Sequence, residues 1–163
     1  KMQTSVPGIY AAGDCAESLD FSTGEYVYFP VGSIAAEGGD IAGINAAGGN
    51  METAGFLRAQ ADNIFGNEVI SIGLSSTTAK EVNLNIKFED LSAFASDSTI
   101  GKKYPALVKA VLDESGTVVG AQVITEKYGS AYSYGLLNAI KNKQKYSDFL
   151  SAWKISLKSF DEI

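Results

Sequence analysis

The chain has 163 residues, 45% of them hydrophobic and 20% charged, which is enough for one domain or for a domain with part of another. Its formal net charge of −6 and its single arginine, Arg58, exclude the basic face that nucleic-acid binding requires. Histidine is absent, which excludes the zinc sites and catalytic triads that depend on it, and no hydrophobic run approaches the ~20 residues of a membrane span.

A short apolar run, residues 9–12, lies directly before Gly13 and Asp14. The turn-forming residues 6–8 (Val-Pro-Gly) lead into it, so we expect a buried strand that stops at Gly13. In open α/β sheets, ligands bind beyond the carboxyl ends of the strands. Gly13 would permit a close approach of the backbone, and the Asp14 carboxylate would accept hydrogen bonds from a sugar or ribityl hydroxyl. Residues 26–29 follow as either a strand or a packed loop.

Residues 33–49 are predicted to form a helix, with Ser33 as its N-cap and Gly48 and Gly49 as its stop signal. Isoleucines recur at helical spacing along it. Each glycine inside the helix costs about 1 kcal/mol relative to alanine, so we expect close packing against a neighbouring element or a ligand. A poorly formed helix is the alternative. The interior glycines are Gly38, Gly39 and Gly43.

The composition changes near Gly66, after a segment in which we expect buried anchors at Phe56, Leu57, Ile64 and Phe65. Residues 69–74 are rich in β-branched side chains and predict a strand. We expect a turn with a short helical piece over residues 75–80, and a half-buried strand over residues 82–88, where apolar and polar residues alternate. The polar residues 92–103 are expected to form an outward loop.

A hairpin is the clearest local prediction in the second half of the chain. The apolar residues 106–112 and 117–124 are joined by Asp-Glu-Ser-Gly, and both faces of the first run are largely apolar, so we expect a sheet covered on both sides. Residues 131–143 predict an amphipathic helix. Aromatic and apolar residues at helical spacing predict a final helix; they are Phe149, Leu150, Trp153, Leu157 and Phe160.

The opening segment TSVPGIYAAGDCAE, residues 4–17, resembles the second flavin-binding motif of the FAD-dependent pyridine nucleotide–disulfide oxidoreductases. The phrase AGINAAGG, residues 42–49, resembles the end of the helix that follows this motif in that family. Residues 69–81 and the hairpin resemble the start and the strands of the family's C-terminal interface domain. The resemblance is good over residues 1–120 and poor beyond them.

The resemblance implies an α+β fold, in which an antiparallel sheet flanked by helices is preceded by a strand and helix of an α/β FAD-binding domain. Residues 1–67 would be the C-terminal part of the FAD domain, and residues 68–163 the dimerisation domain. The chain would belong to a flavoprotein that moves electrons from NAD(P)H through FAD to an acceptor. This sequence identifies neither the acceptor nor the choice between NADH and NADPH.

The same resemblance assigns the cofactor contacts. Asp14 would bind a ribityl hydroxyl of FAD, Gly13 would let the flavin chain pass, and the helix start at Ser33, Ile34 and Ala35 would point N–H groups at the flavin ring. No residue of this chain is expected to be catalytic or to bind a metal. Cys15 is expected to be a packed thiol.

The departures from the family are informative. The Gly-x-Gly-x-x-Gly loop that holds the FAD pyrophosphate is absent, so we expect this chain alone to bind FAD weakly or not at all. The absence of histidine argues against the glutathione-reductase-like branch and favours the NADH oxidase and rubredoxin or nitrite reductase-like branch. We expect a homodimer in a reduced, cytoplasmic setting, with no membrane span. The alternative is a stand-alone, non-catalytic dimerisation module.

Overall fold

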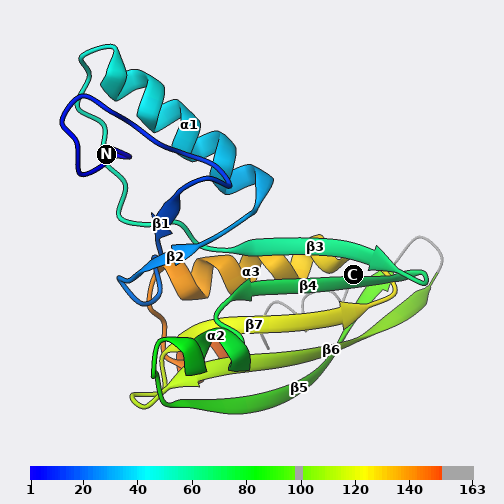
Figure 1. Ribbon diagram of the computed structural model, residues 1–163. Helices are drawn as coiled ribbons and strands as arrows, with labels where there is room; N and C mark the ends of the chain where they lie inside the picture. The colour runs from blue at the N-terminus through cyan, green and yellow to red at the C-terminus, as the bar shows by residue number, and fades with distance from the viewer. Residues whose placement is uncertain (98–100, 152–163) are drawn as a thin grey trace. The chain divides into compact units, whose positions relative to one another are not determined.

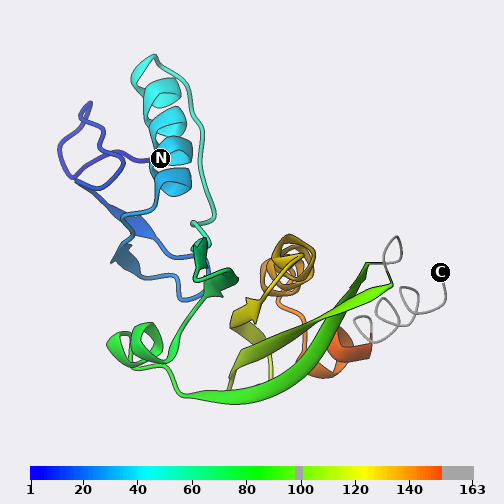
Figure 2. The ribbon, with the colours of Figure 1, turned by 90° about the vertical axis from the view of Figure 1, so that its right-hand side faces the viewer.

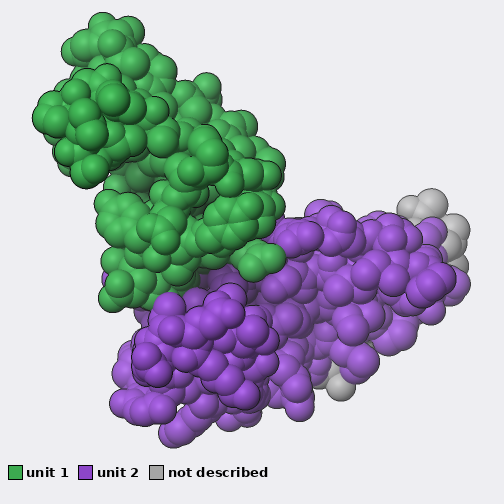
Figure 3. Space-filling view, viewed as in Figure 1, with its two compact units in different colours: residues 1–58 green, residues 59–163 purple. Residues whose placement is uncertain are grey.

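The computed structural model describes residues 1–97 and 101–151, which fall into two compact units, Lys1–Arg58 and Ala59–Ile163 (Figures 1 and 3). The second unit therefore begins before the boundary that the change in composition indicates. The reason is that residues 59–64 form a strand paired with the next one, so the hairpin cannot be divided between units.

The first unit contains a small sheet and one long helix. Strands β1 (Glu17–Leu19) and β2 (Tyr26–Tyr28) pair antiparallel, and helix α1 spans Gly32–Ala46. Residues 26–28 are thus a strand, one of the two alternatives expected there. The core of this unit consists of large apolar side chains from the helix and the segments beside it: Phe29, Ile34, Ile41 and Phe56.

Helix α1 ends in a motif that its sequence predicts. Gly48 has φ +94°, a left-handed conformation that glycine adopts at little cost. Its N–H donates to the Asn45 carbonyl at 3.1 Å, and the N–H of Gly49 donates to the Ile44 carbonyl at 2.9 Å. These two bonds form the Schellman pattern, which satisfies carbonyl groups at the end of the helix.

Residues 9–12 do not form the buried strand that their apolar character predicts. Among the described residues they make one isolated antiparallel bridge, between Gln3 and Tyr10, and Ile9 is 54% exposed. Hydrogen bonds from Thr4 N to Ile9 O (2.9 Å) and from Ala11 N to Met2 O (3.0 Å) instead fold the segment into a short N-terminal loop. The described residues provide no parallel neighbour for a strand here.

The second unit is a five-stranded antiparallel sheet in the order β3-β4-β7-β6-β5 (Figures 1 and 2). Its strands are β3 (Ala59–Ile64), β4 (Asn67–Gly73), β5 (Ile86–Asp97), β6 (Lys102–Asp113) and β7 (Val118–Thr125). Helix α2 (Ser76–Glu81) follows β4, and helix α3 (Gly129–Lys141) packs against β4 and β7. The expected antiparallel sheet flanked by helices is confirmed.

The two faces of this sheet differ. Along β6, Tyr104, Ala106, Val108 and Ala110 are each at most 3% exposed, whereas Leu107 on the opposite face is 64% exposed. The expectation of a sheet covered on both sides is therefore wrong for this part of β6. The opposite face is covered only toward the end of the strand, where Val111 is buried in a cluster that includes residues of the segment after β4.

Three further predictions differ from the structure. Residues 59–64 form a strand that was not expected, and Ile64 and Phe65 are exposed at the tip of its hairpin because β3 is an edge strand whose side chains bury little area. Residues 92–97 and 102–103 extend β5 and β6 in place of an outward loop, because each pairs with the other strand. Residues 82–85 lie outside any strand, so β5 starts only at Ile86.

The segment after α3 returns to the β6–β7 turn. The Lys145 ammonium donates to the Ser115 carbonyl and hydroxyl, both at 2.8 Å, and to Thr117 Oγ1 at 3.0 Å. The buried Val118 donates its N–H to the Gln144 carbonyl at 3.0 Å. Phe149 of the predicted final helix is buried, while Trp153, Leu157 and Phe160 lie outside the described residues.

Candidate functional site

The candidate site begins at the turn formed by Gly13 and Asp14. Gly13 has φ +83°, which favours glycine, and its carbonyl accepts the N–H of Ala16 at 3.1 Å. The turn leaves the Asp14 side chain exposed. A carboxylate in this position can accept hydrogen bonds from a hydroxyl group brought to the surface of the unit.

The second part of the site is the start of α1. Its N-cap is Val31, with extended backbone angles and no side-chain cap, so the prediction that Ser33 caps the helix is wrong. The cap lies earlier because the Val31 carbonyl already accepts the N–H of Ala35 at 2.9 Å. The N–H groups of Gly32, Ser33 and Ile34 come before this first bond and have no acceptor earlier in the helix. They form the positive end of the helix dipole.

The side chains of this first turn point in different directions. Ser33 is exposed, Ala35 is half-buried, and Ile34 is 5% exposed in the core with Phe29 and Ile41. Ile34 could therefore contact a ligand only through its backbone, because its side chain packs inside the unit. The helix start offers backbone donors and one hydroxyl.

The structure brings the turn and the helix start together. A Cβ placed on Gly13 would lie 3.7 Å from the Ala35 Cβ, which is ordinary van der Waals contact. Gly13, Asp14, Ser33, Ile34 and Ala35 thus belong to two segments that meet, as a shared ligand site requires. An exposed carboxylate, a residue without a side chain and a set of backbone donors fit a flavin that carries hydroxyl and carbonyl groups.

Cys15 follows this turn and is exposed, so the expected packed thiol is wrong. Its Sγ lies 3.3 Å from the Ala12 carbonyl. The cysteine borders a hollow of about 550 Å³ in the first unit, whose lining includes Met2, Glu17 and Phe56. Among the described residues, no group of three His, Cys, Asp or Glu side chains could hold a metal ion, and no helix is long and apolar enough to cross a membrane.

Two buried polar residues of the first unit were not predicted. Asp20 is 3% exposed and accepts hydrogen bonds from the Ser22 N–H at 2.9 Å and the Thr23 hydroxyl at 3.1 Å. Burial raises the pKa of Asp20 above its ordinary value, and these two bonds oppose that rise. The Asp-x-Ser-Thr-Gly pattern of residues 20–24 is a signal for such a turn.

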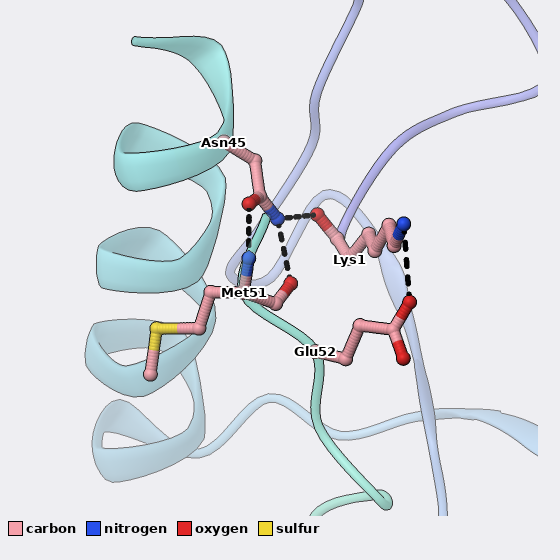
Figure 4. Close-up of polar contacts among 4 residues, drawn as sticks. All are labelled: Lys1, Asn45, Met51 and Glu52. Carbon is pink, nitrogen blue, oxygen red and sulfur yellow. Dashed lines mark hydrogen bonds and ion pairs between the residues drawn. The ribbon is translucent and has the colours of Figure 1, made fainter. Parts of the chain in front are cut away.

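The other buried polar residue is Asn45, near the end of α1, which is 5% exposed. Its side-chain amide donates to the carbonyls of Lys1 and Met51, both at 2.8 Å, and its oxygen accepts the Met51 N–H at 2.6 Å (Figure 4). One side chain of the helix thus binds both residue 1 and the segment that follows the helix. In the sequence, Asn45 belongs to the AGINAAGG phrase of residues 42–49, but that phrase does not predict its hydrogen-bond partners.

Comparison with known proteins gives consistent matches. No family model matches the chain. It is 35% identical over 128 residues to an NADH oxidase of Methanocaldococcus jannaschii, a match that covers 76% of this chain and 28% of that protein. It is 32% identical over 129 residues to a CoA-dependent NAD(P)H sulfur oxidoreductase of Pyrococcus furiosus, with the same two coverages.

Solved structures of related proteins share the fold. An NAD-dependent persulfide reductase from A. fulgidus superposes with a TM-score of 0.81 at 26% identity, over 90% of this chain and 27% of that one. A water-forming NADH oxidase from Lactobacillus brevis gives a TM-score of 0.80 at 23% identity, over 90% of this chain and 33% of that one. The chain thus spans about a third or less of the length of these relatives.

Proposed function

Because the chain belongs to the FAD-dependent pyridine nucleotide–disulfide oxidoreductase family, we propose that it is part of an enzyme that moves electrons from NAD(P)H through FAD to an acceptor. Its first unit would supply one edge of the flavin site, and its second unit would supply an assembly surface. The assignment of residues 1–67 to an FAD domain and of 68–163 to a dimerisation domain is part of this proposal, with the junction moved to Arg58.

The observation that carries the proposal is the meeting of the Gly13–Asp14 turn with the first turn of α1. The two segments are far apart in sequence, and the Cβ position of Gly13 lies 3.7 Å from Ala35. A bound flavin supplies the two-electron redox chemistry of the enzyme. The residues of this chain would hold it in place.

Each residue has a distinct part in this binding. Asp14 accepts a hydrogen bond from a ribityl hydroxyl, and Gly13 leaves room for the ribityl chain because it has no Cβ. The free backbone N–H groups of Ser33 and Ile34 lie at the positive end of α1, next to Ala35, where they favour negative charge on the flavin ring. None of these groups takes or gives a proton in the reaction.

The test is Asp14→Asn in the full-length protein, with bound FAD measured by its visible absorbance per chain. Asparagine keeps the shape and an acceptor oxygen but removes the charge; a charge-assisted bond is worth about 1.5–3 kcal/mol and a neutral one about 0.5–1.5 kcal/mol, so FAD affinity should fall roughly 5-fold to 10-fold. Asp40→Asn, at an exposed position of α1, is the matched control because it makes the same charge change in the same unit. Equal FAD affinity in the two variants would refute the role of Asp14.

The chain by itself should not retain FAD. The contacts named above cover the ribityl and ring portions only, and no Gly-x-Gly-x-x-Gly loop is present for the pyrophosphate. The purified 163-residue chain should elute from gel filtration without the flavin absorbance. A yellow protein peak would contradict this expectation.

The acceptor and the location of the enzyme are also proposals. The relatives include NADH oxidases, a CoA-dependent NAD(P)H sulfur oxidoreductase and an NAD(P)H coenzyme A polysulfide/persulfide reductase. Oxygen and a polysulfide are therefore the acceptors to compare in the full-length protein with NADH and with NADPH. We place the enzyme in the cytoplasm, where an exposed thiol such as that of Cys15 stays reduced.

A second function, assembly of a homodimer, is favoured by the open face of the second unit. Leu107 is 64% exposed and lies directly opposite Ile124, which is 47% exposed, on the neighbouring strand. Adjacent exposed apolar side chains contribute to the contiguous apolar patches that mark interaction surfaces. Leu107→Glu should shift the light-scattering mass toward the monomer, whereas Ser130→Glu, on an exposed position of α3, should not. An unchanged mass for Leu107→Glu would exclude this face from the interface.

A further inference from the structure

We infer that Asn45 is a positioning residue for the flavin edge, because its side chain determines where Gly13 and Asp14 lie along α1. This inference rests on the proposed function, which makes that turn a flavin contact. Asn45 itself lies at the opposite end of the helix from the turn, so it acts through the segment between them.

The first step is the anchoring of residue 1, which lies in the segment that leads to the turn. The buried amide of Asn45 makes its three hydrogen bonds to backbone groups, two to Met51 and one to the Lys1 carbonyl (Figure 4). Backbone partners cannot rotate away as side chains do, so the bonds fix the main chain at both positions. The Lys1–Glu52 ion pair, at 3.1 Å, joins the same two segments, but both side chains are largely exposed and contribute little.

The second step connects residue 1 to the turn. Met2 accepts the N–H of Ala11 at 3.0 Å, and Gln3 bridges Tyr10, so the two arms of the N-terminal loop are tied together. Because of these backbone hydrogen bonds, fixing the main chain at Lys1 also restricts the position of Ala11. Gly13 comes two residues after Ala11.

The third step is the contact of the loop with the helix. Gly38, in the middle of α1, is buried, and a Cβ placed there would lie 3.4 Å from the Met2 Cε and 3.5 Å from the Ala12 Cβ. The loop thus lies along one side of the helix from Asn45 past Gly38 to Ala35. The contact at Gly38 is apolar and has no directional preference, whereas the hydrogen bonds of Asn45 are directional. The Asn45 amide therefore sets the position of the loop along the helix axis.

The test uses the full-length protein and the variant Asn45→Asp. The carboxylate keeps an acceptor for the Met51 N–H but places its second oxygen against two carbonyl groups, so both donated bonds are lost. The FAD dissociation constant, measured by flavin fluorescence, should rise at least about tenfold. Asn50→Asp makes the same charge change at an exposed position five residues on and should leave the constant unchanged. Asn45→Ser, a milder change, is measured in parallel in case the first variant does not fold.

A double-mutant cycle separates positioning from stability. If Asn45 acts through the turn, either Asn45 variant should weaken FAD binding by less than about twofold when Asp14→Ala is already present, because alanine removes the carboxylate that Asn45 positions. An equal loss in both backgrounds would mean that Asn45 only stabilises the unit, and would overturn the inference. If Asp14→Asn weakens FAD binding and neither Asn45 variant does, the inference fails while the proposed function stands. If Asp14→Asn has no effect, the proposed function fails first.

Discussion

The glycines inside α1 offer a direct test of what the helix packs against. Among the described residues, a Cβ placed on Gly39 or Gly43 would have no heavy atom within 4 Å, in contrast to the buried Gly38. Replacing glycine by alanine in an exposed helix interior stabilises the helix by about 1 kcal/mol. Gly39→Ala with Gly43→Ala should therefore stabilise α1 by about 2 kcal/mol, provided the two effects add.

The assay is amide hydrogen exchange of α1 in the purified 163-residue chain, which reports local opening of the helix. A stabilisation of about 2 kcal/mol slows exchange roughly 30-fold. Gly48→Ala is the matched control, since its φ of +94° makes alanine unfavourable, and it should accelerate exchange at the helix end. Unchanged or faster exchange in the Gly39/Gly43 double variant would refute the reasoning, because it would mean that these glycines are needed for a contact.

Three other predictions concern the second unit. Gly120→Ala should lower its free energy of unfolding in urea by about 3 kcal/mol, because a Cβ there would collide with the Leu74 carbonyl; a loss below ~1 kcal/mol would contradict the close approach. Burial raises the pKa of Asp113, but hydrogen bonds and a nearby ammonium outweigh it and hold that pKa below 3.8. Its stabilising effect is therefore present at pH values well above the ordinary pKa and is lost as the pH falls through the lowered pKa, so Asp113→Asn should remove this pH-dependent part of the stability. Burial raises the pKa of Tyr132 to about 12, so Tyr132→Phe should remove one tyrosine from the most alkaline step of the absorbance titration while the unit remains folded.

Several elements could be predicted from the sequence because local signals and tertiary packing agree there. The hairpin of β6 and β7 has an Asp-Glu-Ser-Gly connection between two apolar runs, and the structure contains it. The α3 helix has an apolar stripe, and Tyr132, Leu136 and Ile140 of that stripe are buried. In both cases the pattern of the side chains matches the face that the fold buries.

Other elements could not be predicted because pairing rather than side-chain pattern determines them. Strand β3 has the sequence AQADNI, which shows no apolar alternation, and it forms because β4 offers a free edge for backbone hydrogen bonds. The opposite error occurs at residues 9–12, where an apolar run has no strand beside it among the described residues. Secondary structure in sheets depends on a partner that the local sequence does not reveal.

The flavin contacts assigned to the candidate site stay a prediction, and the residues that support the site were not predicted. The motif identified Asp14 and the helix start, yet the N-cap moved from Ser33 to Val31 because Val31 contributes only its backbone, which has no sequence signature. Asn45 was overlooked as a support for a related reason. Its hydrogen bonds go to main-chain atoms of Lys1 and Met51, and any residue types could stand there.

The chain returns to the β6–β7 turn after α3, and this sets the minimum length of a second unit that folds independently. Val118 is 1% exposed, and its N–H is bonded to the carbonyl of Gln144. A polypeptide that stopped at the end of α3 would leave this donor buried without its acceptor, at a cost of about 1–3 kcal/mol. It would also lose the three bonds from the Lys145 ammonium. Expression of the unit as a separate protein should therefore extend from Ala59 past Lys145, although the last strand of the sheet ends at Thr125.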